Sequence, residues 1–262
     1  MSRPLISIIT CTKNSEKYLK KCLRSVEVQT YKNIEHILVD GLSTDNTLKI
    51  LNDYIHSNKK RRIKLVQSEP KGIANAMNIG YKNSTGEVIH FLHSDDYYYS
   101  KSTLKRVVEY FDQNPGKNWL VGNSVVSYMG RVFSLPVTIL MKGHLEQLIC
   151  TYNIISHENT FVKREIFEKY GLFDETLKVN MDFDYWLRII KDKDNQPIVI
   201  DDNFTVFIVH KGSTSSNPRN WPNAIKEYYN VLKKAKYLPF VGNYENSYLY
   251  KHIKELIDRT SL

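Results

Sequence analysis

Two adjacent aspartates, Asp95 and Asp96, are the residues of this sequence whose chemistry is most readily inferred. They follow a short apolar run at residues 87–92, a pattern typical of a buried strand. Two carboxylates at a strand end repel each other unless a positive charge lies beside them, and Mg²⁺ or Mn²⁺ is a natural partner. The alternative is a polar turn that caps a helix beginning near Leu104. Both interpretations stay open on this stretch alone.

A second polar group follows the apolar run at residues 34–39. Asp40 and Gly41 lead into three residues at 43–45 that can cap a helix. Such a junction presents free backbone N–H groups and a carboxylate to a nucleotide, although an ordinary capped loop explains it equally well. Lys71, before a third helical pattern, is placed either to meet a diphosphate or to lie on the surface.

Asp182 and Asp184 begin a later helical pattern. Residues two apart on a helix diverge by about 200°, so both cannot face one site. We expect one to act as a general base while the other caps the helix or pairs with Arg188 at i+4. His157 and His210 follow apolar segments, where a histidine is more often structural than catalytic.

Alternating strand and helix patterns in the first hundred residues must position these groups. Apolar β-branched runs alternate with helical stripes of apolar residues at i, i+3, i+4 and i+7; the runs lie at 5–10, 34–39, 63–67 and 87–92. This order predicts an α/β fold with a mostly parallel sheet and helices on both faces. Ligands bind beyond the carboxyl ends of such strands, so Asp40 and Asp95 should converge on one edge.

The second half is expected to be more mixed. Residues 119–135 read as a hairpin that turns near Met129 and Gly130, and 198–209 as interrupted strands. Helices are expected at 144–152, 163–170 and 182–190, and again beyond Trp221. We predict a catalytic domain at 1–215, with a donor-binding half at 1–100 and an acceptor half at 101–215, followed by a helical extension at 216–262.

Composition narrows the class of protein. The chain has 262 residues, of which 42% are hydrophobic and 25% charged, as in an ordinary globular protein. Three cysteines without a CxxC pair argue against a disulfide framework or a structural zinc site. The first apolar run is too short for a signal peptide or a membrane span, so we expect a cytoplasmic protein. A net charge of +9 favours anionic partners without choosing among them.

Five ordered blocks together are far more specific than any one motif. They read PLISIIT (4–10) with Asn14, EHILVDGLSTDNT (35–47), SEPKGIANAMNIG (68–80), TGEVIHFLHSDD (85–96), and GLFDE to DFDYWLR (171–188). This series, covering roughly residues 4–215, resembles the family 2 glycosyltransferases. The resemblance implies a GT-A type fold, which is a nucleotide-binding α/β sandwich.

The resemblance also implies roles for particular residues. Thr10 and Asp40 would line the pocket for base and ribose, Asp95 would approach the ribose, and Asp96 would hold a divalent Mn²⁺ or Mg²⁺ ion on the diphosphate. Asp182 would be the catalytic base. Further residues follow from the same blocks, with Asn14, Lys71, Asn75 and Ser94 on the donor side and His157, Asp184, Trp186 and His210 on the acceptor side.

The chain departs from the family pattern at several positions. Met181 stands where many members have glutamate, and Gly41 where many have a second aspartate. Ser94 leaves the acidic motif as Ser-Asp-Asp, and Met77 replaces a diphosphate-binding arginine that Lys71 could substitute. These departures bear on the donor and its contacts more than on the reaction class.

The expected activity is a metal-dependent, inverting transfer of a sugar from a nucleoside-diphosphate-sugar, with a lean to UDP, to a hydroxyl of a glycan or lipid-linked glycan. Bacterial surface polysaccharide or lipopolysaccharide assembly is the expected setting. The basic C-terminal helices could touch the inner face of the membrane, with a helical cap or an oligomer interface as the alternative. A homo-oligomer is left open.

Two other classes fit less well. A sugar-1-phosphate nucleotidyltransferase would favour a loop rich in glycine and arginine after the first strand, whereas residues 11–14 hold one lysine and no glycine. A basic nucleic-acid-binding module would alternate basic and aromatic residues on one exposed face, whereas the 18 tyrosines are scattered or fall at core-like spacing. We therefore expect no nucleic-acid partner.

Overall fold

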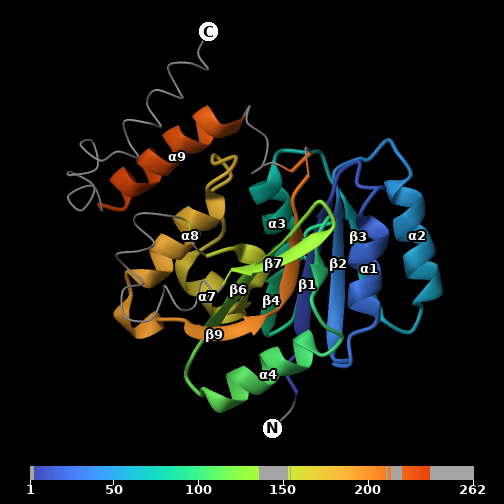
Figure 1. Cartoon of the computed structure of the whole chain (residues 1–262), viewed down its shortest axis with the longest axis horizontal. Coiled ribbons are helices and arrows are strands. Elements are labelled where there is room, and N and C mark those ends of the chain that lie inside the picture. Colours follow the sequence, from blue (N-terminus) through green and yellow to red (C-terminus); the bar gives the residue numbers. More distant parts are fainter. Residues whose placement is uncertain (1–2, 136–152, 154, 211, 214–219, 237–262) are drawn as a thin grey trace.

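The structure, a computed structural model, describes residues 3–135, 153, 155–210, 212–213 and 220–236 (Figure 1). Its first part alternates strands and helices in the order β1 (Ile6–Thr12), α1 (Leu19–Glu27), β2 (Ile34–Asp40), α2 (Thr47–Ser57), β3 (Arg62–Gln67), α3 (Ile73–Lys82) and β4 (Val88–Phe91). The expected strand–helix order of the first hundred residues is confirmed.

The second part is mixed, as expected. It contains β5 (Tyr97–Tyr98), α4 (Thr103–Gln113), β6 (Trp119–Tyr128), β7 (Arg131–Leu135), η1 (His157–Asn159), β8 (Thr160–Lys163), α7 (Arg164–Tyr170), α8 (Met181–Ile190), η2 (Lys193–Asn195), β9 (Ile198–Asn203), β10 (Thr205–Ile208) and α9 (Trp221–Lys234). The hairpin, the interrupted strands and the two helices around Gly171 occur where the sequence predicted them.

One mixed sheet connects these strands in the order β3-β2-β1-β4-β8-β6-β10-β5, with β7 and β9 also paired to β6. Strands β3, β2, β1 and β4 are parallel to their neighbours, whereas β8 runs antiparallel to both β4 and β6. Thr12 pairs with Asp40 in the register of β1 and β2. The carboxyl ends of the parallel strands therefore meet at one edge of the sheet.

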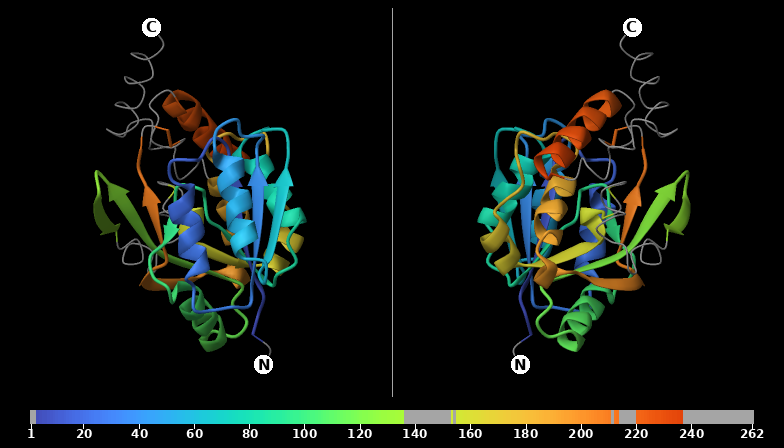
Figure 2. Two further views of the ribbon diagram at one scale, coloured as in Figure 1. Left: turned by 90° about the vertical axis from the view of Figure 1, so that its right-hand side faces the viewer. Right: turned by 90° about the vertical axis from the view of Figure 1, so that its left-hand side faces the viewer.

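Alternate side chains of β1 enter two different cores, because successive residues of a strand point to opposite faces. Ile8 is buried with Cys22 and Val26 of α1, whereas Ile9 is buried with Ala74 and Met77 of α3. Helices thus cover both faces of the sheet (Figure 2), as predicted. Each fully buried isoleucine or leucine contributes about 1.5–3 kcal/mol, so these two stripes hold the helices in place.

Close approach of α3 to β1 requires a glycine. A Cβ on Gly80 would lie 2.2 Å from Cγ2 of Ile9, a distance that real side chains do not tolerate. The substitution would push α3 away from the sheet. Because the first turn of α3 follows the β3 loop at the carboxyl edge, this contact also fixes what α3 presents there.

Helices α7 and α8 build the second half around an aromatic core. Gly171, with φ of 78°, ends α7 in a backbone conformation that L-residues rarely adopt. The indoles of Trp119 in β6 and Trp186 in α8 stack with centroids 5.5 Å apart and an interplanar angle of 7°. This packing holds the N-terminus of α8 at the carboxyl edge of the sheet.

Helix α9 lies against α8, as the orange-red and gold ribbons show (Figures 1 and 2). The expected domain boundary near residue 215 falls outside the described residues and stays a prediction. No helix in the described ranges combines the length and apolar character needed to cross a bilayer.

The loop between β1 and α1 turns the chain at Asn14, which takes a left-handed conformation with φ of 48°, and α1 begins at Leu19. The helix expected at 144–152 lies among residues that the structure does not describe.

Candidate functional site

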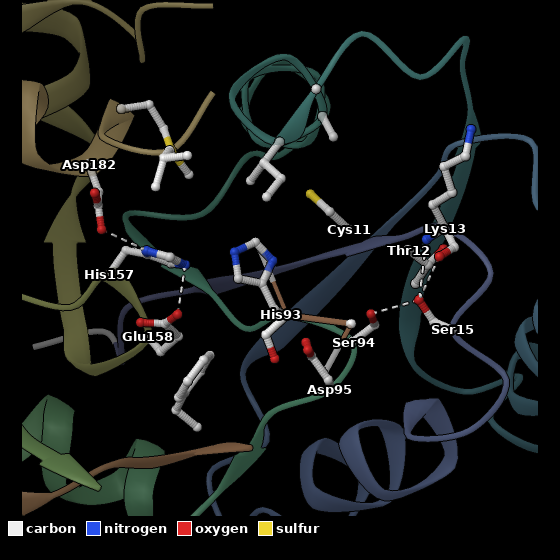
Figure 3. Close-up of a pocket in the computed structure, with 18 of the residues that line it drawn as sticks. Cys11, Thr12, Lys13, Ser15, His93, Ser94, Asp95, His157, Glu158 and Asp182 are labelled. Atoms are coloured by element: carbon white, nitrogen blue, oxygen red, sulfur yellow. Dashed lines mark hydrogen bonds and ion pairs between the residues drawn. The ribbon is translucent and has the colours of Figure 1, made fainter. Parts of the chain in front are cut away.

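A cavity of about 1020 Å³ opens at the carboxyl edge of the sheet. Its walls come from the loops after β1, β3 and β4, from η1, and from the segment that leads into α8. Figure 3 shows Asp95 and Asp182 on two sides of this space, with His93 between them. Segments distant in sequence therefore converge as the strand–helix order predicted.

The β4 end supplies the first wall. Ser94 and Asp95 both line the cavity, and Ser94 Oγ donates a hydrogen bond to Ser15 Oγ at 2.8 Å. Asp95 Oδ2 lies 2.8 Å from Nε2 of His210, whose ring packs on Tyr18 with centroids 4.5 Å apart. A carboxylate and an imidazole are thus held together on the cavity wall.

Asp96, which the resemblance implied as the metal ligand, is not among the residues that line the cavity, and its metal-binding role stays a prediction. Its side chain is 0% exposed, and its Oδ1 accepts a hydrogen bond from the Ile208 backbone N–H at 3.1 Å. Burial, together with the nearby Glu158 and Asp95 carboxylates, raises the pKa of Asp96 well above its ordinary value. The accessible carboxylate of this motif is therefore that of Asp95.

Thr10 and Asp40, which the resemblance implied as donor-binding residues, also lie behind the wall, and their contact with a donor stays a prediction. Both are 0% exposed. Thr10 Oγ1 is 2.9 Å from His36 Nε2, and Asp40 accepts hydrogen bonds from Thr12 Oγ1 at 2.9 Å and from the backbone N–H of Ser43 at 2.9 Å. Asp40 instead ties the β1 and β2 loops together. Thr12 and Gly41, which adjoin them, do reach the cavity.

The remaining donor-side predictions do lie on the cavity wall. Asn14, Lys71 and Asn75 all line it. Asn14 Oδ1 accepts a hydrogen bond from the Thr44 backbone N–H at 2.9 Å, and Asn75 Nδ2 donates to Glu175 Oε2 at 2.8 Å. The side chains of Asn14 and Asn75 therefore hold loops in place beside the cavity, and Lys71 contributes a positive charge to its wall.

Asp182, at the start of α8, forms the opposite wall with His157 and Glu158. Asp182 Oδ2 lies 3.0 Å from His157 Nδ1, and Glu158 Oε1 lies 3.1 Å from His157 Nε2 (Figure 3). Asp182 Oδ1 accepts hydrogen bonds from the Phe183 backbone N–H at 2.7 Å and from Asn153 Nδ2 at 3.2 Å. One imidazole is thus held between two carboxylates.

Electrostatics favour a charged His157. Burial opposes the charge, but the Glu158 and Asp182 carboxylates outweigh it and raise the pKa of His157 to about 9. Burial would raise the pKa of Glu158, but the charge of His157 and a hydrogen bond from Ser156 outweigh it, so that pKa is lowered. Burial first, and then the charge of His157, lowers the pKa of His93. The wall therefore carries one imidazolium and one neutral imidazole near pH 7.

Asp184 and Trp186, expected on the acceptor side, are buried and do not line the cavity, and their role toward an acceptor stays a prediction. Asp184 is 4% exposed and accepts a hydrogen bond from Arg188 Nε at 3.0 Å, the i+4 pair that the sequence offered as an alternative. Trp186 is 1% exposed and its Nε1 donates to the Ile155 carbonyl at 3.0 Å. Both residues support α8 from behind and do not line the cavity.

Sequence reasoning missed His93 and Glu158. Both line the cavity, and both adjoin residues that were singled out, His93 beside Ser94 and Glu158 beside His157. Their adjacency to these residues is the signal in the sequence that could have identified them. Lys178, two residues before the helix cap Asn180, is a third cavity residue that no motif marked.

Two groups of described residues have the chemistry of metal ligands. The first is Asp95 with His210, whose ligand atoms converge at 2.8 Å, with the unpartnered buried Oδ2 of Asp96 behind them. The second is His93, His157 and Glu158, whose ligand atoms all lie within 4.8 Å of one another. Carboxylate oxygens suit Mg²⁺ and Mn²⁺, and imidazole suits transition metals, so the first group fits Mn²⁺.

The mixed sheet, with helices on both faces and a polar cavity at the strand ends, defines a GT-A type fold. Residues 7–171 match the family model described as glycosyl transferase family 2. A PGL/p-HBAD biosynthesis glycosyltransferase of Mycobacterium bovis (strain BCG / Pasteur 1173P2) is 31% identical over 192 residues, which are 72% of this chain and 70% of that protein.

Two solved structures show the same fold. Staphylococcus aureus TarS 1–349 in complex with UDP-GlcNAc superposes with a TM-score of 0.69 at 23% identity, over 96% of this chain and 70% of that one. The mannosyltransferase PcManGT of Pyrobaculum calidifontis, with GDP-Man and Mn²⁺, gives a TM-score of 0.68 at 21% identity, over 88% of this chain and 65% of that one.

The chain belongs to glycosyl transferase family 2, and it is a transferase enzyme. The family and the fold inferred from the five sequence blocks are confirmed.

Proposed function

We propose that this enzyme transfers a sugar from a nucleoside-diphosphate-sugar to an acceptor hydroxyl, with a divalent metal and with inversion at the sugar carbon. One observation carries the proposal: Asp95, after β4, and Asp182, at the start of α8, line the same cavity. The carboxylate of Asp95 can bind a cation that also binds a diphosphate. The carboxylate of Asp182 can remove a proton from an acceptor. Asp95 lies in the turn after β4, and Asp182 lies in the first turn of α8.

The donor side of the cavity is suited to a nucleotide. Lys13 and Lys71 line it and offer positive charge to phosphates. TarS has been solved with UDP and UDP-GlcNAc, and PcManGT with GDP-Man and Mn²⁺, which supports a nucleotide-sugar here. UDP is the nucleotide that we favour.

Asp95 and His210 are the residues that would hold Mn²⁺ or Mg²⁺. When bound, the cation would neutralise the charge that builds on the departing diphosphate. Asp96 would support the site from behind, because its carboxylate is oriented by the Ile208 N–H. His210 is kept in place by the ring of Tyr18.

Asp182 is the proposed general base. Asn153, whose side chain contacts Asp182 Oδ1, comes from an exposed position, so an acceptor hydroxyl can replace that contact. Asp182 then accepts the hydroxyl proton while the oxygen attacks the sugar carbon on the face opposite the diphosphate. The bond to the diphosphate breaks in the same displacement, which inverts the configuration. His157, held by two carboxylates, keeps Asp182 oriented toward the cavity.

The acceptor that we propose is a glycan or a lipid-linked glycan in bacterial polysaccharide or lipopolysaccharide assembly. The mycobacterial relative is named as a PGL/p-HBAD biosynthesis glycosyltransferase, which supports a role in a biosynthetic pathway. We place the enzyme in the cytoplasm, with peripheral contact of the basic C-terminal helices with the inner membrane face. Vesicle co-sedimentation checks this contact: binding to anionic vesicles that survives deletion of residues 221–262 would contradict it.

A product assay tests the proposed reaction. The enzyme is incubated with Mn²⁺ and UDP-, GDP-, dTDP- and CMP-linked sugars, with glycan acceptors, while nucleotide release is followed. We expect one nucleotide class to support release, EDTA to abolish it, and NMR to show an inverted anomer. A product with retained configuration, or release that is undiminished by EDTA, would contradict the mechanism.

A further inference from the structure

Helix α9 contacts the segment that carries the proposed base through one carboxylate. Glu227 accepts hydrogen bonds from three consecutive backbone N–H groups, those of Lys178 at 2.8 Å, Val179 at 2.9 Å and Asn180 at 3.2 Å. Lys178 is bonded to Oε1, whereas Val179 and Asn180 are bonded to Oε2. A single side chain thus binds the whole turn before α8.

This turn has no comparable support of its own. Asn180 is the N-cap residue of α8, yet its side chain makes no capping hydrogen bond. The Asn180 Nδ2 instead donates to the carbonyl of Ala224 in α9 at 2.7 Å. An α-helix leaves its first N–H groups unsatisfied, and the chain before it needs external partners. Here α9 provides them, two residues before Asp182.

Other contacts keep Glu227 in register with α8. The rings of Phe183 and Tyr228 stack with centroids 4.6 Å apart and an interplanar angle of 15°. Val231 and Leu232 are buried in the core that also contains Met181. The position of Glu227 is therefore set by the packing of Tyr228, Val231 and Leu232, which follow it in α9.

The same turn forms part of the cavity wall. Lys178, Val179 and Asn180 line the cavity together with Asp182. A shift of the turn would move both the charge of Lys178 and the carboxylate of Asp182 relative to a bound acceptor. Displacement of a reacting group by about 1 Å can cost a hundredfold in rate.

We propose that Glu227 is a positioning residue for catalysis, which acts through the Lys178–Asn180 turn to hold Asp182 at the acceptor. The inference rests on the proposed role of Asp182. It makes α9 a component of the catalytic apparatus, in addition to its role as a cover for α8. Asp95 of the donor wall lies away from Asp182 across the cavity (Figure 3), so binding at that wall should not depend on Glu227.

The test compares Glu227→Ala and Glu227→Gln with the full-length enzyme. Steady-state rates are measured with the best nucleotide-sugar from a UDP-, GDP- and dTDP-sugar panel, and nucleotide Kd by calorimetry. We expect Glu227→Ala to lower kcat about 10- to 100-fold with nucleotide Kd unchanged within about twofold. Glu227→Gln keeps one acceptor oxygen and should recover part of kcat. Glu168→Ala, which removes an exposed glutamate of α7, is the matched control and should behave as wild type.

The outcomes separate this inference from the proposed function. Wild-type kcat in Glu227→Ala, beside an inactive Asp182→Asn, would overturn the positioning role and leave the base assignment standing. Equal losses of kcat and of nucleotide affinity in Glu227→Ala would show a general structural role and would also overturn the inference. Full activity in Asp182→Asn would overturn both the assignment of Asp182 as the base and the positioning role of Glu227. Amide hydrogen exchange gives an independent readout, because Glu227→Ala should speed exchange at residues 178–180 selectively.

Discussion

Asp182 Oδ2 and His157 Nδ1 lie 3.0 Å apart, although 25 positions separate the two residues in the chain. The other ring nitrogen of His157 lies 3.1 Å from Glu158 Oε1, so the imidazole is fixed at both ends. A fixed partner holds the Asp182 carboxylate in one orientation while its second oxygen faces the exposed Asn153. This pairing orients the carboxylate that we propose as the general base.

Replacement of Asp182 by asparagine tests this role. The amide keeps the size of the side chain but cannot accept a proton, so transfer should fall by about 10²- to 10⁴-fold. Nucleotide affinity should stay within about twofold, because the donor wall is separate. Asp194→Asn, at an exposed position after α8, is the control and should retain full activity. Rates of transfer close to wild type in Asp182→Asn would refute the assignment.

The raised pKa of His157 predicts a loss of stability in alkaline solution. An unfolded histidine has a pKa of about 6.5, whereas the pKa of His157 in the folded enzyme is about 9. The folded state therefore binds the proton more tightly, and this stabilisation is complete below pH 6.5 and lost as the pH rises through 9. Urea unfolding at a series of pH values between 6.5 and 9 measures this fall in the free energy of unfolding.

The variant His157→Gln should remove most of this pH dependence. His56→Gln, on the exposed side of α2, should leave it unchanged. If the free energy of unfolding of His157→Gln falls with pH as steeply as that of wild type, the imidazolium between the two carboxylates is not its source.

Trp186 distinguishes a core role from a role in acceptor binding. In Trp186→Phe the hydrogen bond to the Ile155 carbonyl and much of the stack on Trp119 are lost. We expect unfolding free energy to drop by about 1–3 kcal/mol, with nucleotide affinity and acceptor KM unchanged in the folded enzyme. Denaturant unfolding measures the loss, with exposed Tyr229→Phe as a control of small effect. A selective rise in acceptor KM without loss of stability would restore the acceptor-side interpretation.

Much of the fold could be predicted because local and global signals agree in the first hundred residues. The stripe Leu19, Cys22, Leu23 and Val26 has helical spacing, and all four side chains are buried in α1. Alternating strands and helices then leave few topologies other than a mostly parallel sheet. The convergence of Asp95 with distant residues followed from this topology, since parallel strands end at one edge.

The orientation of individual side chains could not be predicted in the same way. Thr10 and Thr12 are two positions apart in β1, and only the exact end of the strand decides which reaches the cavity. Asp95 and Asp96 are adjacent, and the Ile208 N–H from a strand more than a hundred residues later binds Asp96 on the buried side. Glu227 carries no motif at all. Its role depends on how α9 packs on α8, which sequence periodicity does not encode.

The most direct test of the proposed metal-bridged donor site is calorimetric titration of the enzyme with UDP, GDP, dTDP and CMP, each with Mn²⁺ and with EDTA. We expect that one nucleotide binds and that EDTA weakens its binding. Asp95→Asn or His210→Gln should lower the affinity by about tenfold or more, equivalent to about 1.4 kcal/mol. His56→Gln should bind as wild type. The metal-bridged donor site would be contradicted if Asp95→Asn in EDTA bound the nucleotide as tightly as wild type in Mn²⁺. It would also be contradicted if the folded enzyme bound none of the four nucleotides.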